Sequence, residues 1–433
     1  MEVSMFTPAI TSTWTNIINH FFPIFTLPTA NIFACLANGW ILCTGRRTVT
    51  GMVRFAGLFT GRPHDAFHRF FSAAKWSVEQ LWRLLAILLV EKFYPGGTIH
   101  LDLDDTLFHR PGKKVAGASR WRDPVRSEKI VVLARGLNLI VVTLRVYPPW
   151  NGEPIALPVN MRLRIKGGPG HIDLAYAMLT QIAAWLPDRH IICHCDGFYT
   201  ALIDRDLPGI HLITRMRKDA IIYDLPQKEK TRRGPKRVRG QLLAKPFRLV
   251  ESIKNFKPVT TLERGRKRKR LVWSKPVIWY HVSKRPVMLV ISRDPTNKQR
   301  EDFFVTTDLT LKSAQVVGQF AGRWSIEDTF RNTKQLLGGQ QPQTFRREGP
   351  ERAAAMSLWL YSVTWLWYLR NRKLWKKLPK LPWYCQKATP SFADALAALR
   401  EQLWQERINC MFGDHIGFET IPKFIITALT YAA

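Results

Sequence analysis

Three acidic positions in this chain have the chemistry and the surroundings to bind divalent metal ions. The neighbouring Asp104 and Asp105 end a largely apolar segment, residues 99–103, Asp196 ends another, residues 191–195, and Glu327 lies in a charged segment much later in the chain. Carboxylates are ligands that Mg²⁺ prefers, and two such ions on separate rigid elements can activate a hydroxyl and stabilise a leaving oxygen. The order strand, strand, helix for these acids is what a two-metal phosphoryl-transfer site requires.

The segment around Glu327 predicts an α-helix with one charged face. At about 100° per residue, five positions fall on a single strip of that helix. They are Phe320, Arg323, Glu327, Arg331 and Lys334. A neighbouring strip, at positions 326, 330 and 337, is apolar. A carboxylate between cations could hold a metal while its neighbours bind phosphates; the alternative is an ordinary solvated helix.

The overall charge indicates a polyanionic partner. The 433 residues include 65 Lys and Arg against 33 Asp and Glu, which gives a formal net charge of +32. Such an excess favours binding to the phosphate backbone of nucleic acid. Membrane surfaces are also anionic, but no uninterrupted apolar run is long enough to span a bilayer. We therefore expect a nucleic acid as the partner and an intracellular protein without membrane association.

Hydrophobic periodicity predicts a mixed α/β core between two helical ends. Helices are expected at residues 30–43, 63–74 and 77–94, strands at 98–106, 129–134, 137–147 and 190–194, and a helix at 174–186. The N-terminal helices could present a helix to a DNA groove or only buttress the core. The C-terminal helical part is expected to pack on the core and shape a DNA channel.

A basic, β-rich segment separates Asp196 from Glu327. Strands are expected at residues 247–253, 272–279 and 287–292, with basic loops at 228–239 and 264–270. A disordered basic stretch is the alternative, but strands flank both runs. We expect DNA contacts from the cations of this part of the chain. They are Arg215, Arg217, Arg232, Arg233, Lys236, Arg237, Arg266, Lys267 and Arg268.

These motifs resemble those of the DDE transposases of bacterial insertion sequences, in the IS4-like superfamily and most like the IS701 family. Arg323, Glu327 and Lys334 match the Tyr-two-Arg-three-Glu-six-Lys signature of that group, with Phe320 in the tyrosine position, and residues 324–327 match its Trp-x-Ile-Glu. Residues 104–106 (Asp-Asp-Thr) and 195–197 (Cys-Asp-Gly) resemble its first and second motifs. The resemblance spans residues 101–337 approximately. Phe320 lacks the phenolic hydroxyl of the family residue.

The resemblance implies an RNase H-like core that cuts at terminal inverted repeats and joins the freed 3′ ends to target DNA. It implies Asp104, Asp105, Asp196 and Glu327 as catalytic residues, with Mg²⁺, for which Mn²⁺ could substitute, held by Asp104, Asp196 and Glu327. Neighbouring strand side chains face opposite ways, so only one of the two adjacent aspartates can point into the site, and the Asp-x-Thr spacing favours Asp104.

The resemblance also implies double-stranded DNA as the partner, a cytoplasmic, nucleoid-associated protein, DNA contacts from the helix around Glu327, and a dimer. The contacts would come from Arg323, Lys334, Arg331, Phe320 and Trp324, and joining two ends calls for at least a homodimer on DNA. We divide the chain into a helical N-terminal DNA-binding domain (1–95), two parts of the core (96–209 and 307–340), a basic insertion (210–306) and a C-terminal helical region (341–433). The alternatives are a non-transposing metal-dependent nuclease and an inactive DNA-binding regulator.

Overall fold

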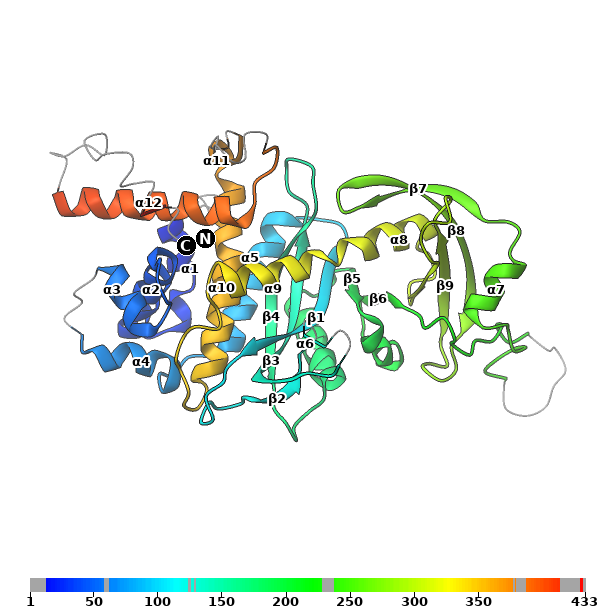
Figure 1. Ribbon diagram of the computed structural model, residues 1–433, viewed down its shortest axis with the longest axis horizontal. Coiled ribbons are helices and arrows are strands. Elements are labelled where there is room, and N and C mark those ends of the chain that lie inside the picture. Colours follow the sequence, from blue (N-terminus) through cyan, green and yellow to red (C-terminus); the bar gives the residue numbers. More distant parts are fainter. Residues whose placement is uncertain are drawn as a thin grey trace, which may run out of the picture.

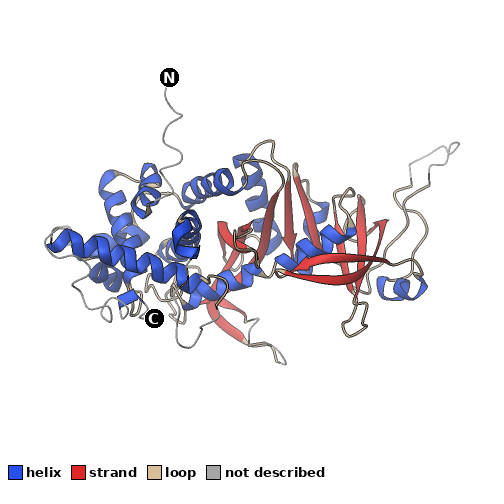
Figure 2. Ribbon diagram, turned by 90° about the horizontal axis from the view of Figure 1, so that it is seen from above, coloured by secondary structure: helices blue, strands red, loops and turns tan. Residues whose placement is uncertain are grey.

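A ten-stranded mixed sheet runs through the computed structural model, and most of the helices gather at one end of it (Figure 1). The structure describes residues 13–57, 62–123, 126–127, 130–227, 237–376, 378, 387–412 and 429–430. Seen from above, the strands occupy the middle and one end of the molecule and the helices the other end (Figure 2). The predicted α/β class, a mixed sheet with flanking helical regions, is confirmed.

Five neighbouring strands form the core of the sheet in the order β4-β3-β1-β5-β6. They are β1 (Ile99–His109), β3 (Leu133–Val146), β4 (Ile155–Arg164), β5 (Ile191–Cys195) and β6 (Ile210–Arg215). β3 is antiparallel to β1 and β4, whereas β5 and β6 run parallel to β1. This mixed order, with β1 at the centre, is the RNase H-like core expected from the sequence. A short strand, β2 (Ser119–Arg122), pairs with the beginning of β3.

The basic segment after β6 extends the same sheet through four antiparallel strands. In order from β6 they are β10 (Asp302–Thr306), β9 (Pro286–Arg293), β8 (Arg266–Ile278) and β7 (Lys257–Glu263). The expected strands at 272–279 and 287–292 are therefore present, as parts of β8 and β9. Because β10 pairs with both β6 and β9, core and insertion share one hydrogen-bonded sheet.

Helices cover the sheet where its strands are apolar. α6 (His171–Trp185) contacts β3 and β4, and α5 (Val78–Phe93) and α10 (Gly349–Arg370) contact β4. Residues 349–369 of α10 are almost all buried, since this helix is surrounded by other elements on every side. None of the described helices combines the length and the apolar character needed to cross a bilayer.

The other helices from the two ends of the chain form a cluster with α10. They are α1 (Trp14–His20), the short 3₁₀ helix η1 (Phe22–Ile24), α2 (Leu27–Leu42), α3 (Val49–Ala56), α4 (His64–Ser72), α11 (Arg372–Lys376) and α12 (Phe392–Phe412). The predicted helix at 77–94 begins where its capping residue indicates, because Ser77 Oγ accepts a hydrogen bond of 3.2 Å from the backbone N–H of Gln80. Helices from both ends of the chain thus share one apolar core with the sheet.

Two expected strands are a single strand in the structure. The residues predicted as 129–134 and 137–147 contribute to the continuous strand β3, which begins at Leu133; positions 128 and 129 lie outside the described residues. Gly136 does not interrupt the strand because its missing side chain lets β1 approach: a Cβ there would lie 2.3 Å from the backbone oxygen of Phe108. The prediction also missed β2 and β4.

Two further expectations in the basic segment were wrong. Residues 247–253 form not a strand but α7 (Pro246–Ser252), in which Pro246 occupies the first turn and Pro246 and Val250 are buried one helical turn apart. The expected basic loop at 264–270 is the hairpin between β7 and β8: Arg264 and Gly265 form the turn with φ of 49° and 70°, and β8 begins at Arg266. The expected loop at 228–239 lies largely outside the described residues, which resume at position 237.

Candidate active site

The sheet register brings the first two acidic positions together. β1 and β5 pair in parallel with Leu103 opposite Cys195, so the next residues, Asp104 within β1 and Asp196 immediately after β5, lie beside each other. The sequence analysis placed Asp104 at the end of a strand, but β1 continues to His109 because it pairs with β3 that far. Adjacent strands are about 4.8 Å apart. Asp196 caps the 3₁₀ helix η2 (Gly197–Asp204), and its Oδ1 accepts a 2.6 Å hydrogen bond from the N–H of Gly197. Two acids distant in sequence therefore face one small region.

Glu327 reaches this region from a helix that is broken where the sequence predicted continuity. α8 (Ser313–Gly322) and α9 (Ser325–Gln335) are separated by Arg323 and Trp324, whose backbones remain right-handed. Around this break, N–H groups bond to carbonyls three residues back, as in a 3₁₀ turn. The buried Arg145 is the physical reason, because its Nη1 donates 2.6 Å to the carbonyl of Gln319. The side chains before and after Arg323 therefore do not lie on the single continuous strip that the sequence predicted.

Arg323 links two of the three acids. Its Nη1 lies 2.6 Å from Asp104 Oδ2, and its Nη2 lies 3.8 Å from Glu327 Oε1. Burial, reinforced by the charges of Asp105 and Asp196, raises the pKa of Asp104 to about 6, even though Arg323 opposes this rise. Burial also raises the pKa of Glu327, with a contribution from the charge of Asp196. Burial is thus the main reason that both pKa values rise; the attraction of Arg323 outweighs the repulsion from any one of the other acids but does not offset burial.

Asp105 points to the opposite face of β1 and has partners of its own. Its Oδ2 accepts a 3.0 Å hydrogen bond from Asn138 Nδ2 and lies 3.7 Å from His171 Nε2 on α6. Burial raises its pKa, but the hydrogen bonds from His171 and Asn138 outweigh burial and lower the pKa below its ordinary value. Asp104 and Asp105 therefore differ in surroundings as the alternation of a strand requires.

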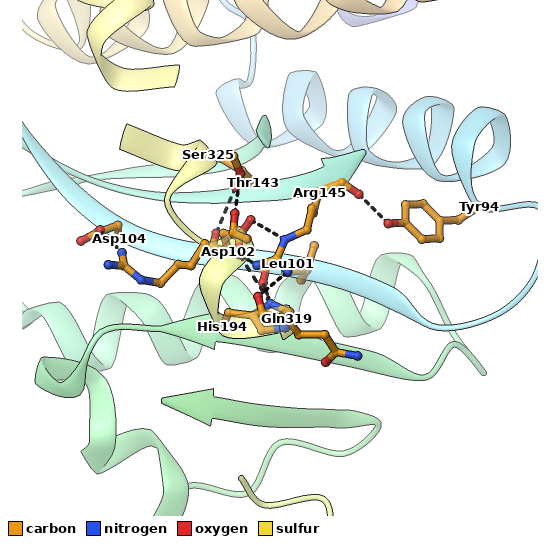
Figure 3. Close-up of polar contacts among 11 residues, drawn as sticks. Tyr94, Leu101, Asp102, Asp104, Thr143, Arg145, His194, Gln319 and Ser325 are labelled. Carbon is orange, nitrogen blue, oxygen red and sulfur yellow. Dashed lines mark hydrogen bonds and ion pairs between the residues drawn. The ribbon is translucent and has the colours of Figure 1, made fainter. Parts of the chain in front are cut away.

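A fully buried ion-pair network supports the site from beneath, and the sequence interpretation missed it (Figure 3). Asp102, two residues before Asp104, binds Arg145 through both carboxylate oxygens. His194 Nδ1 lies 3.5 Å from Asp102 and 2.8 Å from the carbonyl oxygen of Leu101. Burial alone would raise the pKa of Asp102, but Arg145 lowers it and keeps the group ionised. The network ties β1, β3 and β5 to the end of α8.

A basic cavity of about 300 Å³ adjoins the break between α8 and α9. Its cationic lining comes from Arg215, Arg264, Arg268 and Arg270, with Trp324 at one side. The Arg264 guanidinium lies 4.3 Å from the centre of the Trp324 ring, and its charge lowers the pKa of Glu327 against the effect of burial. The turn of the β7–β8 hairpin therefore contributes a cation next to the acids. Trp324 is 44% exposed, an accessible aromatic face.

Comparison with known proteins identifies the family. A family model described as DDE superfamily endonuclease matches residues 20–285, which is more than half of the chain. The chain belongs to the DDE superfamily endonucleases. A cryo-EM structure of the piggyBac transposase synaptic complex with hairpin DNA is similar with a TM-score of 0.43 and 10% sequence identity, over 98% of this chain and 84% of that chain. No curated protein matches the sequence.

The family match covers two of the acids of this endonuclease. Asp104 and Asp196 lie inside the matched residues, whereas Glu327 lies beyond their end. The association of Glu327 with the other two acids therefore depends on the structure and not on the family match. In the structure Glu327 pairs with Arg323, and the charge of Asp196 raises its pKa.

Two residues of the endonuclease that were predicted to contact DNA lie inside the protein. Phe320 is 3% exposed and packs against Phe304 with ring centroids 4.9 Å apart and ring planes tilted by 46°, and Arg323 is 8% exposed. Lys334 is partly buried over the Phe108 ring, and burial lowers its pKa to about 8. The prediction gave this charged face to metal and DNA, but part of the face packs inside the protein.

The other predicted DNA contacts lie on the surface or outside the described residues. Arg331 is exposed and pairs with Asp328 at 2.7 Å. The side chains of five further cations on and near β6 and β8 are also exposed: Arg215, Arg217, Arg266, Lys267 and Arg268. Arg237 is exposed at the end of the basic run. Arg232, Arg233 and Lys236 lie outside the described residues.

The acids of the endonuclease fit a divalent cation. Asp104 lies within β1, Asp196 follows β5 and Glu327 lies on α9; burial raises the pKa of Asp104 and Glu327, and the charge of Asp196 contributes to both rises. Converging carboxylates that repel one another are stabilised by an added cation, and oxygen ligands suit Mg²⁺ or Mn²⁺. DDE superfamily enzymes generally use divalent metals, and this donor set is consistent with that chemistry.

Proposed function

We propose that this endonuclease is a transposase of the IS4-like superfamily, most like the IS701 family. It would cleave DNA at the terminal inverted repeats of its insertion sequence and join the 3′ ends to target DNA. The observation that carries the proposal is that Arg323 pairs with both Asp104 and Glu327, while the parallel pairing of β1 and β5 places Asp196 beside Asp104. DNA, present in the complex of the similar piggyBac structure, is the proposed partner.

The three acids would hold two Mg²⁺ ions beside the scissile phosphate. When bound, the metal supplies Lewis-acid stabilisation of the phosphate and makes a hydroxyl nucleophilic at neutral pH. Asp104 would present carboxylate oxygens from within β1 and Asp196 from the end of β5, and Glu327 would close the site from α9. Asp105, already bonded to Asn138 and near His171, is proposed to position β1 rather than to bind the ion.

The cations around the site would hold the DNA. Arg264 and Trp324 form an exposed cationic and aromatic pair next to Glu327, which suits a phosphate and a base near the cleaved end. The exposed cations of β8 would extend this contact along the duplex. Arg323 neutralises part of the acid charge and would hold Asp104 and Glu327 in place while the DNA binds. The N-terminal helices are proposed as a further DNA-binding region, with a homodimer joining two ends.

Substitution of the helix acid tests the proposal. Glu327→Gln should abolish excision of a plasmid-borne copy of the gene with its natural flanking DNA, because a neutral amide is a weak metal ligand. Binding of the same DNA should stay within about threefold. The matched control is Asp328→Asn, whose exposed side chain pairs only with Arg331 among the described contacts and which should leave excision nearly unchanged. Persistent excision by Glu327→Gln would remove this residue from the site.

The reaction products and their dependence on divalent ions distinguish a transposase from a nuclease that does not join ends and from a DNA-binding regulator. A transposase should give joined products with target DNA as well as cut ends, whereas a nuclease gives only cut ends. Chelation of divalent ions should stop both reactions, and Mg²⁺ or Mn²⁺ should restore them. Binding without any metal-dependent scission would instead indicate a regulator.

A further inference from the structure

A second group of possible metal ligands lies at the other end of the central strands. His190, His211 and Asp308 each offer a ligand atom, and these atoms all lie within 4.8 Å of one another. His190 immediately precedes β5, and Asp196 follows the same strand six residues later. At about 3.3 Å per residue the two groups are roughly 20 Å apart. The histidines therefore do not belong to the proposed catalytic site.

The sheet places the three residues side by side. β5 and β6 pair in parallel with Ile192 opposite His211, so His190 at the start of β5 lies next to the beginning of β6. The segment after β10 continues along β6, because the N–H of Thr307 donates 3.1 Å to the carbonyl of Leu212. This pairing brings Asp308 to the two histidines. The rings of His190 and His211 lie 5.0 Å apart.

Two of the side chains are held in an orientation that suits metal binding. Asp308 is buried, and its Oδ1 accepts hydrogen bonds of 2.9 and 2.6 Å from the N–H and the hydroxyl of Thr310. Its Oδ2 lies 3.9 Å from His190 Nε2. His190 Nδ1 lies 3.2 Å from Thr98 Oγ1, so donation to this hydroxyl would leave Nε2 with a lone pair toward Asp308. Such outer hydrogen bonds are typical of metal-binding histidines.

We infer that His190, His211 and Asp308 form a Zn²⁺ site. Two imidazole nitrogens with one carboxylate favour zinc over magnesium, which prefers oxygen ligands alone. Zinc ligands at about 2.0–2.2 Å from the ion lie ~3.3 Å from each other, so these ligand atoms must approach one another by up to about 1.5 Å. His190 is 45% exposed and has room to rotate, and water would complete the shell.

The position indicates a structural role. The ion would join the start of β5, the start of β6 and the end of β10, which is the strand that returns from the basic insertion to the core. It would stabilise the junction between these two parts of the sheet without touching the acids that are proposed to cut DNA. Binding of zinc should therefore raise stability and leave the chemistry of the acids unaltered.

The test is zinc binding by the full-length protein in excess Mg²⁺, which occupies sites made of oxygen ligands alone. Equilibrium dialysis should give one Zn²⁺ per chain. His190→Ala and His211→Ala should each weaken binding by more than about 100-fold, and Thr98→Val by about 10-fold, since outer-shell partners are worth 10–100-fold. His281→Ala, an exposed histidine in the insertion, is the matched control and should bind as the wild type does.

Thermal unfolding gives the second readout. Zinc should raise the melting temperature of the wild type by about 2–4 °C and should not change that of His211→Ala. Should His211→Ala fold poorly, Asp308→Asn serves instead, because the amide oxygen can still accept from Thr310. The inference is overturned if the wild type binds no stoichiometric zinc, or if the histidine variants bind it as tightly as His281→Ala. Because no DNA cleavage is measured, these outcomes are independent of the proposed transposase function.

Discussion

Asp102 and Asp104 lie on the same face of β1, two residues apart, and their surroundings are opposite. Asp102 is fully buried, and Arg145 holds its pKa below the ordinary value. Asp104 shares one arginine with Glu327 and lies near two other acids, and burial raises its pKa to about 6. The protein fully compensates the first charge and leaves the second partly uncompensated. A partly uncompensated carboxylate is one that an external cation can stabilise.

The largest expected effect comes from neutralising the second carboxylate. Asp104→Asn should reduce DNA cleavage by at least about 10⁴-fold, equal to roughly 5.5 kcal/mol of barrier, because a metal ligand is lost. The purified variant should remain folded by circular dichroism and bind DNA. The measurement is the initial rate of strand cleavage with Mg²⁺. The control is Asp105→Asn, which should reduce this rate less than Asp104→Asn does. Equal losses in both variants would contradict the assignment of Asp104 to the metal.

Neutralising the first carboxylate should instead damage the fold. Asp102→Asn leaves the buried charge of Arg145 without its ionic partner, which costs about 3–5 kcal/mol of unfolding free energy. Urea unfolding measures this loss. The control is Asp173→Asn, which breaks an exposed ion pair of 2.8 Å with Arg205 and should cost less than about 1 kcal/mol. A small loss for Asp102→Asn would show that the network does not support the site.

The pH dependence of stability should separate the two environments further. The pKa of Asp104 is about 6 in the folded protein against about 3.9 unfolded, so its stabilising contribution is present below pH 4 and is lost as the pH rises through 6. The stability of Asp104→Asn relative to wild type should therefore increase by about 1–3 kcal/mol between pH 4 and pH 8 in a chelating buffer. Denaturant titrations across this range test it. A difference that is independent of pH would contradict the raised pKa.

The smallest effect is expected at Phe320 on α8, which lies in sequence between the residue that contacts the Asp102–Arg145 pair and the residue that contacts Asp104. Its neighbour Gln319 accepts from Arg145, and Arg323 binds Asp104. Phe320 also lines the basic cavity, so the added hydroxyl of Phe320→Tyr has polar space to enter. Cleavage should stay within about threefold of wild type, and stability should change by less than about 1 kcal/mol. The control for lost packing is Phe320→Leu, which removes the aromatic ring that packs against Phe304. A severe loss of cleavage in Phe320→Tyr would show that the ring occupies an apolar site that excludes a hydroxyl.

The core of the fold could be predicted because its signals are local. Apolar segments that end in acids marked β1 and β5, and Ser77 marked the start of a helix. The break at Arg323 could not be predicted, because it depends on Arg145, which lies far away in sequence and donates to the end of α8. α7 was mistaken for a strand because its apolar residues are too few to establish a period.

The candidate site also divides into residues with a local sequence signal and residues whose role depends on distant contacts. Asp104, Asp196 and Glu327 were proposed from their positions on regular elements; in the structure β5 places Asp196 beside Asp104, and Arg323 pairs with both Asp104 and Glu327. The network of Asp102, Arg145 and His194 was missed, although a single arginine in the otherwise apolar residues 139–146 is a signal that a buried carboxylate is needed. The position of Arg264 beside Trp324 and Glu327 depends on how the β7–β8 hairpin packs, and a local sequence pattern cannot predict that packing.

The shared sheet also bears on how such a protein can change. Because β10 pairs with β6 on one side and β9 on the other, removal of the basic segment would leave β6 with an unpaired edge open to other chains. Variation is therefore easier at the far hairpins and loops than at the junction. A designer who wishes to alter DNA preference should exchange the β7–β8 turn and keep β9, β10 and their pairing intact.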